Sequence, residues 1–408
     1  MRRGIARFRQ CFLSEFIIHL CILSICFLST LILSGCWDYQ GLGDQTIVAG
    51  IAVDMGEEGN GFALTFEIVD LKGHEGGQFG SLLLDTKGET LTEAVYDAYA
   101  RLHSHVYLGV ADVVVISQAV AEQVGVDTLV NYLIRDKNAR SNVRILVAGT
   151  ETARELFDPV EAGDDAEGGS EGPGQGPRVL LSQILSESLS PTRRGISSAT
   201  DARAAYEVYH ILNRGTSDLA LPIVGPAEAE DIPFQLDGLA LFRGGRMVGT
   251  LDEADMPLYL LATTGLRDRI FPVTVEGLTE EEERAVIAVQ RSRAQVEFDW
   301  VGDVPRFFLD IRIEADVAQP PASWEAMDQT VVRRLERGAE QTLSGQVLEL
   351  AERLRDGGHD VLGFAEAVRS RDPRLWEQIA GDWQAWLRVS EIDAWVEVRI
   401  QNTETTSG

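Results

Sequence analysis

The sequence predicts a mixed α/β protein of the α+β class, with three folded domains after an export leader. Several short segments alternate apolar with polar residues, which is the period of half-buried β-strands. Other segments place apolar residues three and four positions apart, the period of amphipathic helices. Because both kinds of segment are interleaved along the 408 residues, we expect helices and strands to share each domain.

The leader, residues 1–35, has the composition of a secretory signal peptide. Four arginines within the first nine residues precede an apolar stretch over 17–33. Glu15 and His19 shorten its apolar core to about fifteen residues, whereas a helix that spans a membrane needs roughly 20. An uncleaved membrane anchor is the alternative interpretation, and the length of this core disfavours it.

Leu33-Ser34-Gly35-Cys36 ends the leader and resembles a bacterial lipobox. In that motif the cysteine becomes the first residue of the mature protein and carries a diacylglycerol on its sulfur and an acyl chain on its amine. The small residues Ser34 and Gly35 allow an extended backbone in the peptidase site. We therefore predict lipid attachment at Cys36, where several chains at about 0.8 kcal/mol per buried CH₂ anchor more firmly than a single myristoyl group.

The cysteine count and the net charge restrict the other kinds of site. Of the four cysteines, three lie in the leader, so the mature chain keeps Cys36 alone. It has no cysteine pair for an internal disulfide or a cysteine-based metal site, and its apolar cores must hold the fold. The net charge of −28 predicts repulsion of nucleic acid. We expect no nucleic-acid partner.

The N-terminal domain is predicted over 36–190 and opens with a β-hairpin. QTIVAGIAVD and the alternating GFALTFEIVD flank the turn residues EEGNG. Thr90 and Glu93 form a capping box that begins an amphipathic helix. VADVVVIS predicts a strand that is buried on both faces. Helices near 118–124 and 127–135 and a strand over 143–149 complete this part.

Residues 161–177 within that domain predict a disordered loop. The segment EAGDDAEGGSEGPGQGP holds six glycines, two prolines and five acidic residues, and cannot bury enough surface to offset its ordering entropy. Residues 168–172 match the G-x-S-x-G pattern of a nucleophile elbow. That motif needs a strand before it and a helix after it. Neither is predicted, so we reject a catalytic serine there.

A middle domain is predicted over 191–276 and a C-terminal domain over 277–408. The segments expected from 178 onward and through the middle domain are helices near 178–189, 199–213 and 252–264, strands near 217–224 and 234–242, and a hairpin over 238–251. The C-terminal domain is expected to contain strands near 288–300 and 305–317, a helix over 323–356, a helix that begins at Asp372-Pro373, and a closing strand.

The sequence contains few residues in patterns that indicate catalysis. His103 and His105 would share one face of a strand and could hold a metal, but structural zinc needs about four ligands, so a polar helix-to-strand junction is the preferred interpretation. HExxH, Walker A and GxGxxG patterns are absent. Trp376, Trp383 and Trp386 have helical spacing, and we expect them to pack on a sheet, with ligand stacking as the alternative. No metal or cofactor is predicted besides the lipid on Cys36.

Several segments in order resemble the Ger(x)C lipoproteins. The first is GCWDYQGLGDQTIVAGIAVDMGEEGNGFALTFEIVD, which is similar to the family's N-terminal signature. The later matches are ETLTEAVYDAYARL, SHVYLGVADVVVISQAVAEQVGVDTLVNYLIRDKNAR, GLALFRGGRMVGTL and DVLGFAEAVRSRDPRLWEQIAGDWQAW. The resemblance covers nearly the whole mature chain, although 161–177 is longer and richer in glycine than the family's usual sequence.

The resemblance implies a non-catalytic, lipid-anchored subunit of a spore germinant receptor. Such subunits have three mixed α/β domains, act beside two integral membrane subunits in nutrient-triggered germination, and lie on the outer face of the spore inner membrane. Direct germinant binding is left open. Two other functions stay as alternatives: a lipoprotein receptor that itself holds a small germinant, and an exported hydrolase or metal enzyme built on His103 and His105.

Overall fold

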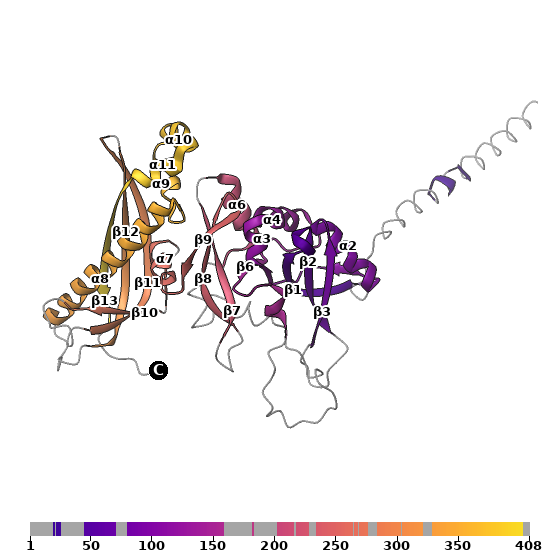
Figure 1. Cartoon of the computed structure of the whole chain (residues 1–408), viewed down its shortest axis with the longest axis horizontal. Helices are drawn as coiled ribbons and strands as arrows, with labels where there is room; N and C mark the ends of the chain where they lie inside the picture. The colour runs from indigo at the N-terminus through magenta and orange to yellow at the C-terminus, as the bar shows by residue number, and fades with distance from the viewer. Residues whose placement is uncertain are drawn as a thin grey trace, which may run out of the picture. The chain divides into compact units, whose positions relative to one another are not determined.

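A computed structural model of the chain describes most residues after the leader. The described residues are 19–20, 22–25, 45–70, 80–158, 182, 202–215, 218–227, 234–263, 265–267, 269–275, 284–302, 304–320 and 329–402. Two compact units are present, Met1–Gln45 and Thr46–Gly408, and Figure 1 shows the chain. Within the described residues, no helix combines the length and the apolar character that crossing a membrane requires.

The first sheet contains nine strands among the described residues. Eight follow the order β3-β2-β1-β5-β6-β7-β8-β9, and β4 pairs with β1. The strands are β1 (Gln45–Met55), β2 (Phe62–Asp70), β3 (Gly80–Gly88), β4 (His105–Tyr107), β5 (Val113–Ile116), β6 (Arg144–Ala148), β7 (Leu219–Pro226), β8 (Phe234–Arg243) and β9 (Arg246–Asp252). The central pairs β1–β5, β5–β6 and β6–β7 are parallel, and the pairs toward both edges are antiparallel.

Four helices cover one face of this sheet, because parallel neighbours need crossover connections. They are α2 (Leu91–Leu102), α3 (Gln118–Gln123), α4 (Val126–Arg135) and α6 (Ala205–Arg214). The predicted capping box is confirmed: the Glu93 N–H donates to the Thr90 Oγ1 at 3.2 Å, and the Glu93 carboxylate accepts from the Thr90 N–H. This pairing fixes where α2 begins.

Strand β5 is buried on both faces, as the sequence predicts. Val114 and Ile116 pack under the four helices. Val113 and Val115 pack on the opposite face against the short 3-10 helix η3 (Arg154–Phe157). The hydrophobic effect therefore acts on both sides of the sheet centre, and this explains the unbroken apolar run in the sequence.

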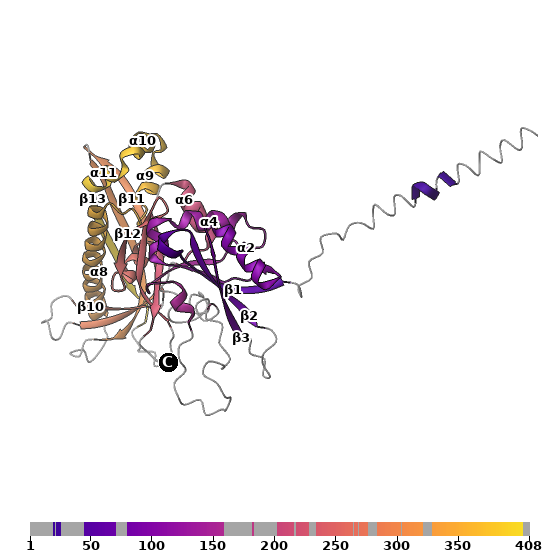
Figure 2. The same ribbon diagram turned by 45° about the vertical axis from the view of Figure 1, so that its right-hand side comes forward.

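The second sheet has the order β10-β11-β12-β13. Its strands are β10 (Arg269–Thr274), β11 (Arg284–Val301), β12 (Val304–Gln319) and β13 (Glu391–Ile400). The helices of this part are α8 (Gln329–Gly357), α9 (Phe364–Arg371), α10 (Pro373–Ile379) and α11 (Trp383–Val389). Both views show α8 lying along the sheet (Figures 1 and 2), where its buried stripe includes Leu335, Leu343 and Leu354.

Helix α7 (Met256–Ala262) joins the two sheets in one core. Met256, Tyr259 and Leu261 are fully buried. The same hydrophobic cluster contains Leu239 of the first sheet and Ile311 of the second. The residues from Thr46 onward accordingly form a single compact unit.

Most of the predicted elements are present, the predicted helix near 178–189 lies outside the described residues apart from residue 182, and three strands were missed. The hairpin of β8 and β9 is confirmed, and Gly244 and Gly245 in its turn have φ values of 55° and 88°, which glycine adopts without strain. The sequence did not predict β3, β4 or β10. The first sheet continues from the predicted N-terminal domain into the middle one, and β10 precedes the boundary at 276. The three domains stay a prediction.

The prediction of a single helix after Asp372-Pro373 is wrong. Asp372 does cap α10, accepting from the N–H groups of Arg374 and Leu375. However, α10 ends at Ile379, and a 3-10 turn, η5 (Ala380–Asp382), separates it from α11. Gly381 lies within this turn, and glycine has a low helix propensity. The break changes the directions in which the tryptophans point.

Candidate functional site

The predicted lipid-attachment residue Cys36 lies outside the described residues. The same holds for Leu33, Ser34 and Gly35, and for the loop over 161–177 with its G-x-S-x-G match. Lipid attachment at Cys36 therefore stays a prediction from the sequence.

His103 and His105 lie at a helix-to-strand junction. His103 is the C-cap of α2 in the left-handed conformation, with φ of 52°. His105 begins β4, and its ring lies 5.5 Å from that of Tyr99, edge to face. In the part of the chain that the structure describes, no three His, Cys, Asp or Glu side chains are grouped as metal ligands. This environment matches the polar junction that the sequence favours.

The three tryptophans pack against the core of the second sheet, and two of them also line a cavity. Trp386 lies 5.5 Å from Trp300 of β11, and Trp383 lies 6.2 Å from Phe307 of β12, measured between ring centroids. The predicted packing of these two residues on a sheet is confirmed. Trp376 contacts Trp383 edge to face at 5.3 Å and is packed against the same hydrophobic core, and both of these indoles also line a cavity.

Asp218 and Asp360 form the floor of that cavity. Asp218 directly precedes β7, and Asp360 lies between α8 and α9. The Asp360 N–H donates to the Asp218 Oδ2 at 2.9 Å, and the Asp218 N–H donates to the Asp360 carbonyl oxygen at 3.1 Å. We call this reciprocal pair the aspartate clasp. It connects the first sheet to the helices that cover the second.

The Asp360 carboxylate organises the start of α9. It is 2% exposed and accepts from the N–H groups of Phe364 at 2.7 Å and Ala365 at 2.8 Å. Its Oδ2 also accepts from the indole N–H of Trp383 at 2.9 Å. Burial raises the pKa of Asp360 to about 7, although these three donors favour the ionised form. Three hydrogen bonds within the fold therefore hold this side chain in place.

Arg243, the last residue of β8, contacts Asp218 of the clasp and the two residues that precede Asp360. Its Nε lies 3.7 Å from the Asp218 Oδ2, and its terminal nitrogen donates to the Gly358 carbonyl and to the His359 Nδ1. Burial, followed by the charge of Arg243, lowers the pKa of His359. Burial raises the pKa of Asp218 in spite of Arg243. Neutral His359 is therefore the form that can accept from Arg243.

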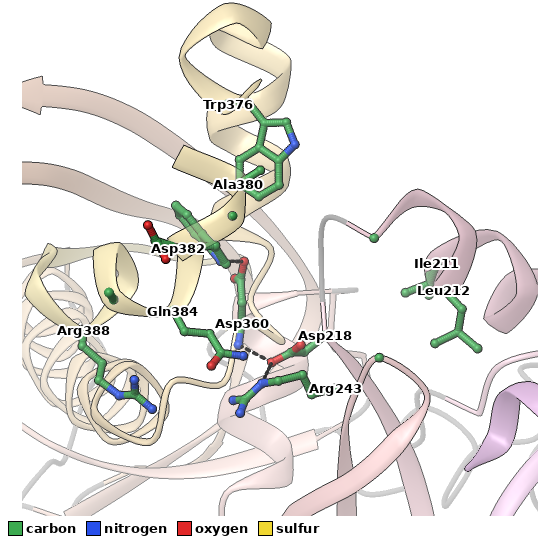
Figure 3. Close-up of a pocket in the computed structure, with 15 residues that line it drawn as sticks. Ile211, Leu212, Asp218, Arg243, Asp360, Trp376, Ala380, Asp382, Gln384 and Arg388 are labelled. Atoms are coloured by element: carbon green, nitrogen blue, oxygen red, sulfur yellow. Dashed lines mark hydrogen bonds and ion pairs between the residues drawn. The ribbon is translucent and has the colours of Figure 1, made fainter. Parts of the chain in front are cut away.

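The cavity above the clasp has a volume of about 580 Å³, within the range of small-molecule sites. Figure 3 shows Trp376 on one side, Ile211 and Leu212 on the other, and the clasp with Arg243 between them. Gln384 and Arg388 of α11 also line it. Unlike Asp360 and Arg243, these two side chains have no hydrogen bond or ion pair to any described residue, so they are free to contact a solute.

Sequence reasoning did not single out Asp218, Arg243 or Asp360. The clasp residues are 142 positions apart, and acidic residues are too numerous in this chain for any pair to stand out. One signal was present: Asp360 precedes the first helical residue by four positions, a spacing at which a carboxylate can accept from the first free N–H groups of a helix.

Two family models match the chain. The spore germination protein N-terminal domain matches residues 38–168. The spore germination B3/GerAC-like C-terminal model matches residues 237–404. These ranges include β1 to β6, most of β8 and β9 to β13, and the second contains Arg243 and Asp360 of the cavity floor. Both descriptions name germination and neither names a chemical reaction.

Whole-length relatives and a solved structure agree with this match. Spore germination protein KC of Bacillus subtilis (strain 168) is 20% identical, with 94% of this chain and 96% of the relative covered. Protein YndF of the same organism is 22% identical, with 94% and 95% covered. The crystal structure of the GerBC protein has a TM-score of 0.52 at 16% identity, covering 86% of this chain and 97% of that one, which shows a shared fold. The chain therefore belongs to the Ger(x)C family of spore germination proteins and has a role in spore germination.

Proposed function

We propose that the chain is a non-catalytic, lipid-anchored subunit of a spore germinant receptor, needed for nutrient-triggered germination. The observation that carries the proposal is the lipobox-like Leu33-Ser34-Gly35-Cys36 at the end of a signal peptide, in a chain that two germination family models match. In this proposal a diacylglycerol and an N-acyl chain on Cys36 hold the protein on the outer face of the spore inner membrane. Two integral membrane subunits are its partners.

The physical advantage of the lipid is a higher effective concentration. A protein confined to a membrane surface meets membrane partners far more often than one that diffuses freely, without any new contact between them. The aspartate clasp and the shared core around α7 keep the domain that follows compact. Assembly would therefore depend on the lipid for location and on the folded surface for recognition.

Cys36→Ala tests the anchor, and Cys26→Ala, which changes a cysteine inside the leader, is its matched control. We expect Cys36→Ala spores to lose the acylated N-terminal peptide in mass spectrometry and to germinate poorly with nutrients. Cys26→Ala spores should keep both properties. Normal germination by Cys36→Ala spores, with the protein still in the membrane fraction, would contradict the anchoring role.

Assembly has its own test. A tagged chain purified from spore membranes in mild detergent should bring down two integral membrane proteins in constant proportion. Recovery of the chain alone, under conditions in which the membrane proteins stay soluble, would contradict the subunit role.

A second function is supported by the cavity above the aspartate clasp. Its volume of about 580 Å³, its aromatic wall at Trp376 and the free groups of Gln384 and Arg388 suit a small polar solute with one apolar face. Calorimetry of the full chain in neutral detergent, with amino acids and sugars as ligands, tests it. Binding that Trp376→Ala abolishes and that the exposed Trp395→Ala retains would support this function. Absence of heat with every ligand would contradict it.

A further inference from the structure

An unbalanced group of arginines lies on the face of the second sheet that points away from α8. In β12 the buried Ile311 and Ile313 alternate with the exposed Arg312 and Glu314. In β13 the buried Val396 and Val398 alternate with Glu397 and Arg399. Because successive side chains of a strand point to opposite faces, these charged residues share the face without helices. We call it the open face.

Strand register places six charged residues in two adjacent rows of the open face. The first row runs Arg293, Arg312, Glu397 across β11, β12 and β13. The second row runs Arg291, Glu314, Arg399 across the same strands. Arg293 and Arg312 are direct cross-strand partners, an arrangement in which like charges destabilise a sheet. Four guanidinium groups are therefore gathered around two carboxylates.

Glu397 and Asp310 are already engaged with two of the four arginines. Glu397 contacts Arg399 at 2.8 Å and Arg312 at 3.9 Å, and Asp310 contacts Arg312 at 2.9 Å. Within the described residues, no ion pair or hydrogen bond of the side chains reaches Arg291 or Arg293. Arg293 has an arginine as its direct cross-strand partner and Arg291 lies opposite Glu314, so four guanidinium groups share the two carboxylates of these rows, in a chain whose net charge is −28.

The other end of the open face shows that such rows can be balanced. Arg306 contacts Asp393 at 2.7 Å and Glu391 at 3.7 Å. Its guanidinium also lies 5.1 Å from the centre of the Phe308 ring. The cation of that row therefore has two carboxylates and an aromatic face around it. The excess of positive charge is thus confined to the rows around Arg293.

A cavity of about 230 Å³ lies over these rows, lined by all four arginines together with Glu314 and Glu397. We propose that this cavity binds a phosphate-type oxyanion, held between Arg291 and Arg293 with Arg312 and Arg399 at its edge. The planar guanidinium presents paired N–H donors that match the oxygens of a phosphate group. A bound dianion removes the repulsion between Arg293 and Arg312. This site is separate from the lipid anchor and from the aspartate clasp.

The test uses the full-length chain in neutral detergent at constant ionic strength. Pyrophosphate is titrated in exchange for chloride while the melting temperature is followed, because a ligand that binds only the folded state raises it. We expect a saturable rise. Arg293→Gln and Arg291→Gln should raise the half-maximal concentration roughly tenfold or more. Arg374→Gln, which removes an exposed arginine of α10, is the matched control and should respond like the wild type.

Two further comparisons make the result decisive. Without pyrophosphate, Arg293→Gln should melt no lower than the wild type, since it removes a like-charge neighbour.

The second comparison distinguishes a lipid headgroup from a soluble phosphate compound as the ligand. Short-chain phosphatidylglycerol is added to the micelle, with phosphatidylcholine of equal chain length as its control. A rise in melting temperature with phosphatidylglycerol alone assigns the site to a lipid headgroup, and a rise with pyrophosphate assigns it to a soluble phosphate compound. No rise with either probe, or equal rises in the Arg291 and Arg293 variants, would overturn the proposal.

Discussion

Asp218 and Asp360 hold each other through two hydrogen bonds across 142 positions of sequence, one of 2.9 Å from the Asp360 N–H to the Asp218 carboxylate and one of 3.1 Å in the reverse direction. One partner directly precedes β7 and the other begins the segment that leads into α9. The pair is therefore a direct connection between the first sheet and the helices above the second.

Replacing Asp218 should weaken this connection. Asp218→Ala removes the acceptor of the buried Asp360 N–H, and an unsatisfied buried donor costs about 1–3 kcal/mol. Asp218→Asn keeps an acceptor oxygen and loses only the charge that faces Arg243 at 3.7 Å, so it should cost less. Urea unfolding of the two variants measures the difference in free energy. Glu377→Ala, on an exposed position of α10, serves as control, and equal losses in all three variants would contradict the clasp.

The stability of the protein should fall between about pH 4 and pH 7 through Asp360. Its pKa is about 7 in the folded protein against an ordinary value of 3.8. In this interval the folded state holds a proton that the unfolded state has released, so the free energy of unfolding decreases as the pH rises, with a slope on the order of 1 kcal/mol per pH unit. Above about pH 7 the contribution of Asp360 to the free energy of unfolding no longer changes with pH.

Comparison with Asp360→Asn isolates that slope. The stability of the wild type minus that of Asp360→Asn should decline from pH 4 to pH 7, while the same difference for Asp356→Asn, which removes an exposed carboxylate, should stay level. A constant difference for Asp360→Asn would show that burial does not perturb this carboxyl.

Trp383→Phe should extend the same decline to higher pH. The variant keeps an aromatic ring against Phe307 and removes the indole N–H that donates to the Asp360 Oδ2 at 2.9 Å. Loss of a donor to the ionised form raises the pKa of Asp360 further above 7. Trp386→Phe, which leaves Asp360 untouched, is the control. The pH profile of the melting temperature distinguishes the two variants.

Two glycines of α8 should respond oppositely to alanine. A Cβ on Gly338 would lie 2.0 Å from the Thr274 carbonyl oxygen of β10, so Gly338→Ala must displace the helix from the strand, at about 1–3 kcal/mol. Nothing lies within 4 Å of a Cβ on Gly345, so Gly345→Ala should stabilise the helix by roughly 0.5–1 kcal/mol. The denaturant midpoints of the two variants measure both changes in stability. A Gly338→Ala variant more stable than the wild type would contradict the close packing of α8 on β10.

Local patterns predicted the elements whose causes lie close in sequence. The capping box of Thr90 and Glu93, the hairpin of β8 and β9 and the doubly buried β5 all depend on neighbouring residues, and all are confirmed. The strand β3 escaped prediction because its sequence, GSLLLDTKG, has a single β-branched residue, Thr86, and no aromatic residue. β3 is stabilised by pairing with β2, which no local signal shows.

The helix expected to continue through Trp376, Trp383 and Trp386 shows the same limit. Its apolar spacing is helical, but η5 interrupts it, so Trp376 lines the cavity while Trp386 packs on β11. The periodicity predicted packing on a sheet, and all three indoles are packed against the core that contains the second sheet. The break between α10 and α11 is a feature that periodicity does not contain.

By itself, the sequence determined the mixed α/β class, the family and the expected anchor at Cys36, because these depend on local composition and on motifs that are contiguous in the chain. Only the tertiary structure decided which charged residues meet. The clasp of Asp218 with Asp360 and the rows around Arg293 join residues from distant segments. Burial raises the pKa values of Asp218 and Asp360, and strand register sets which charges of the rows are neighbours; both arise only when the sheets and helices pack together.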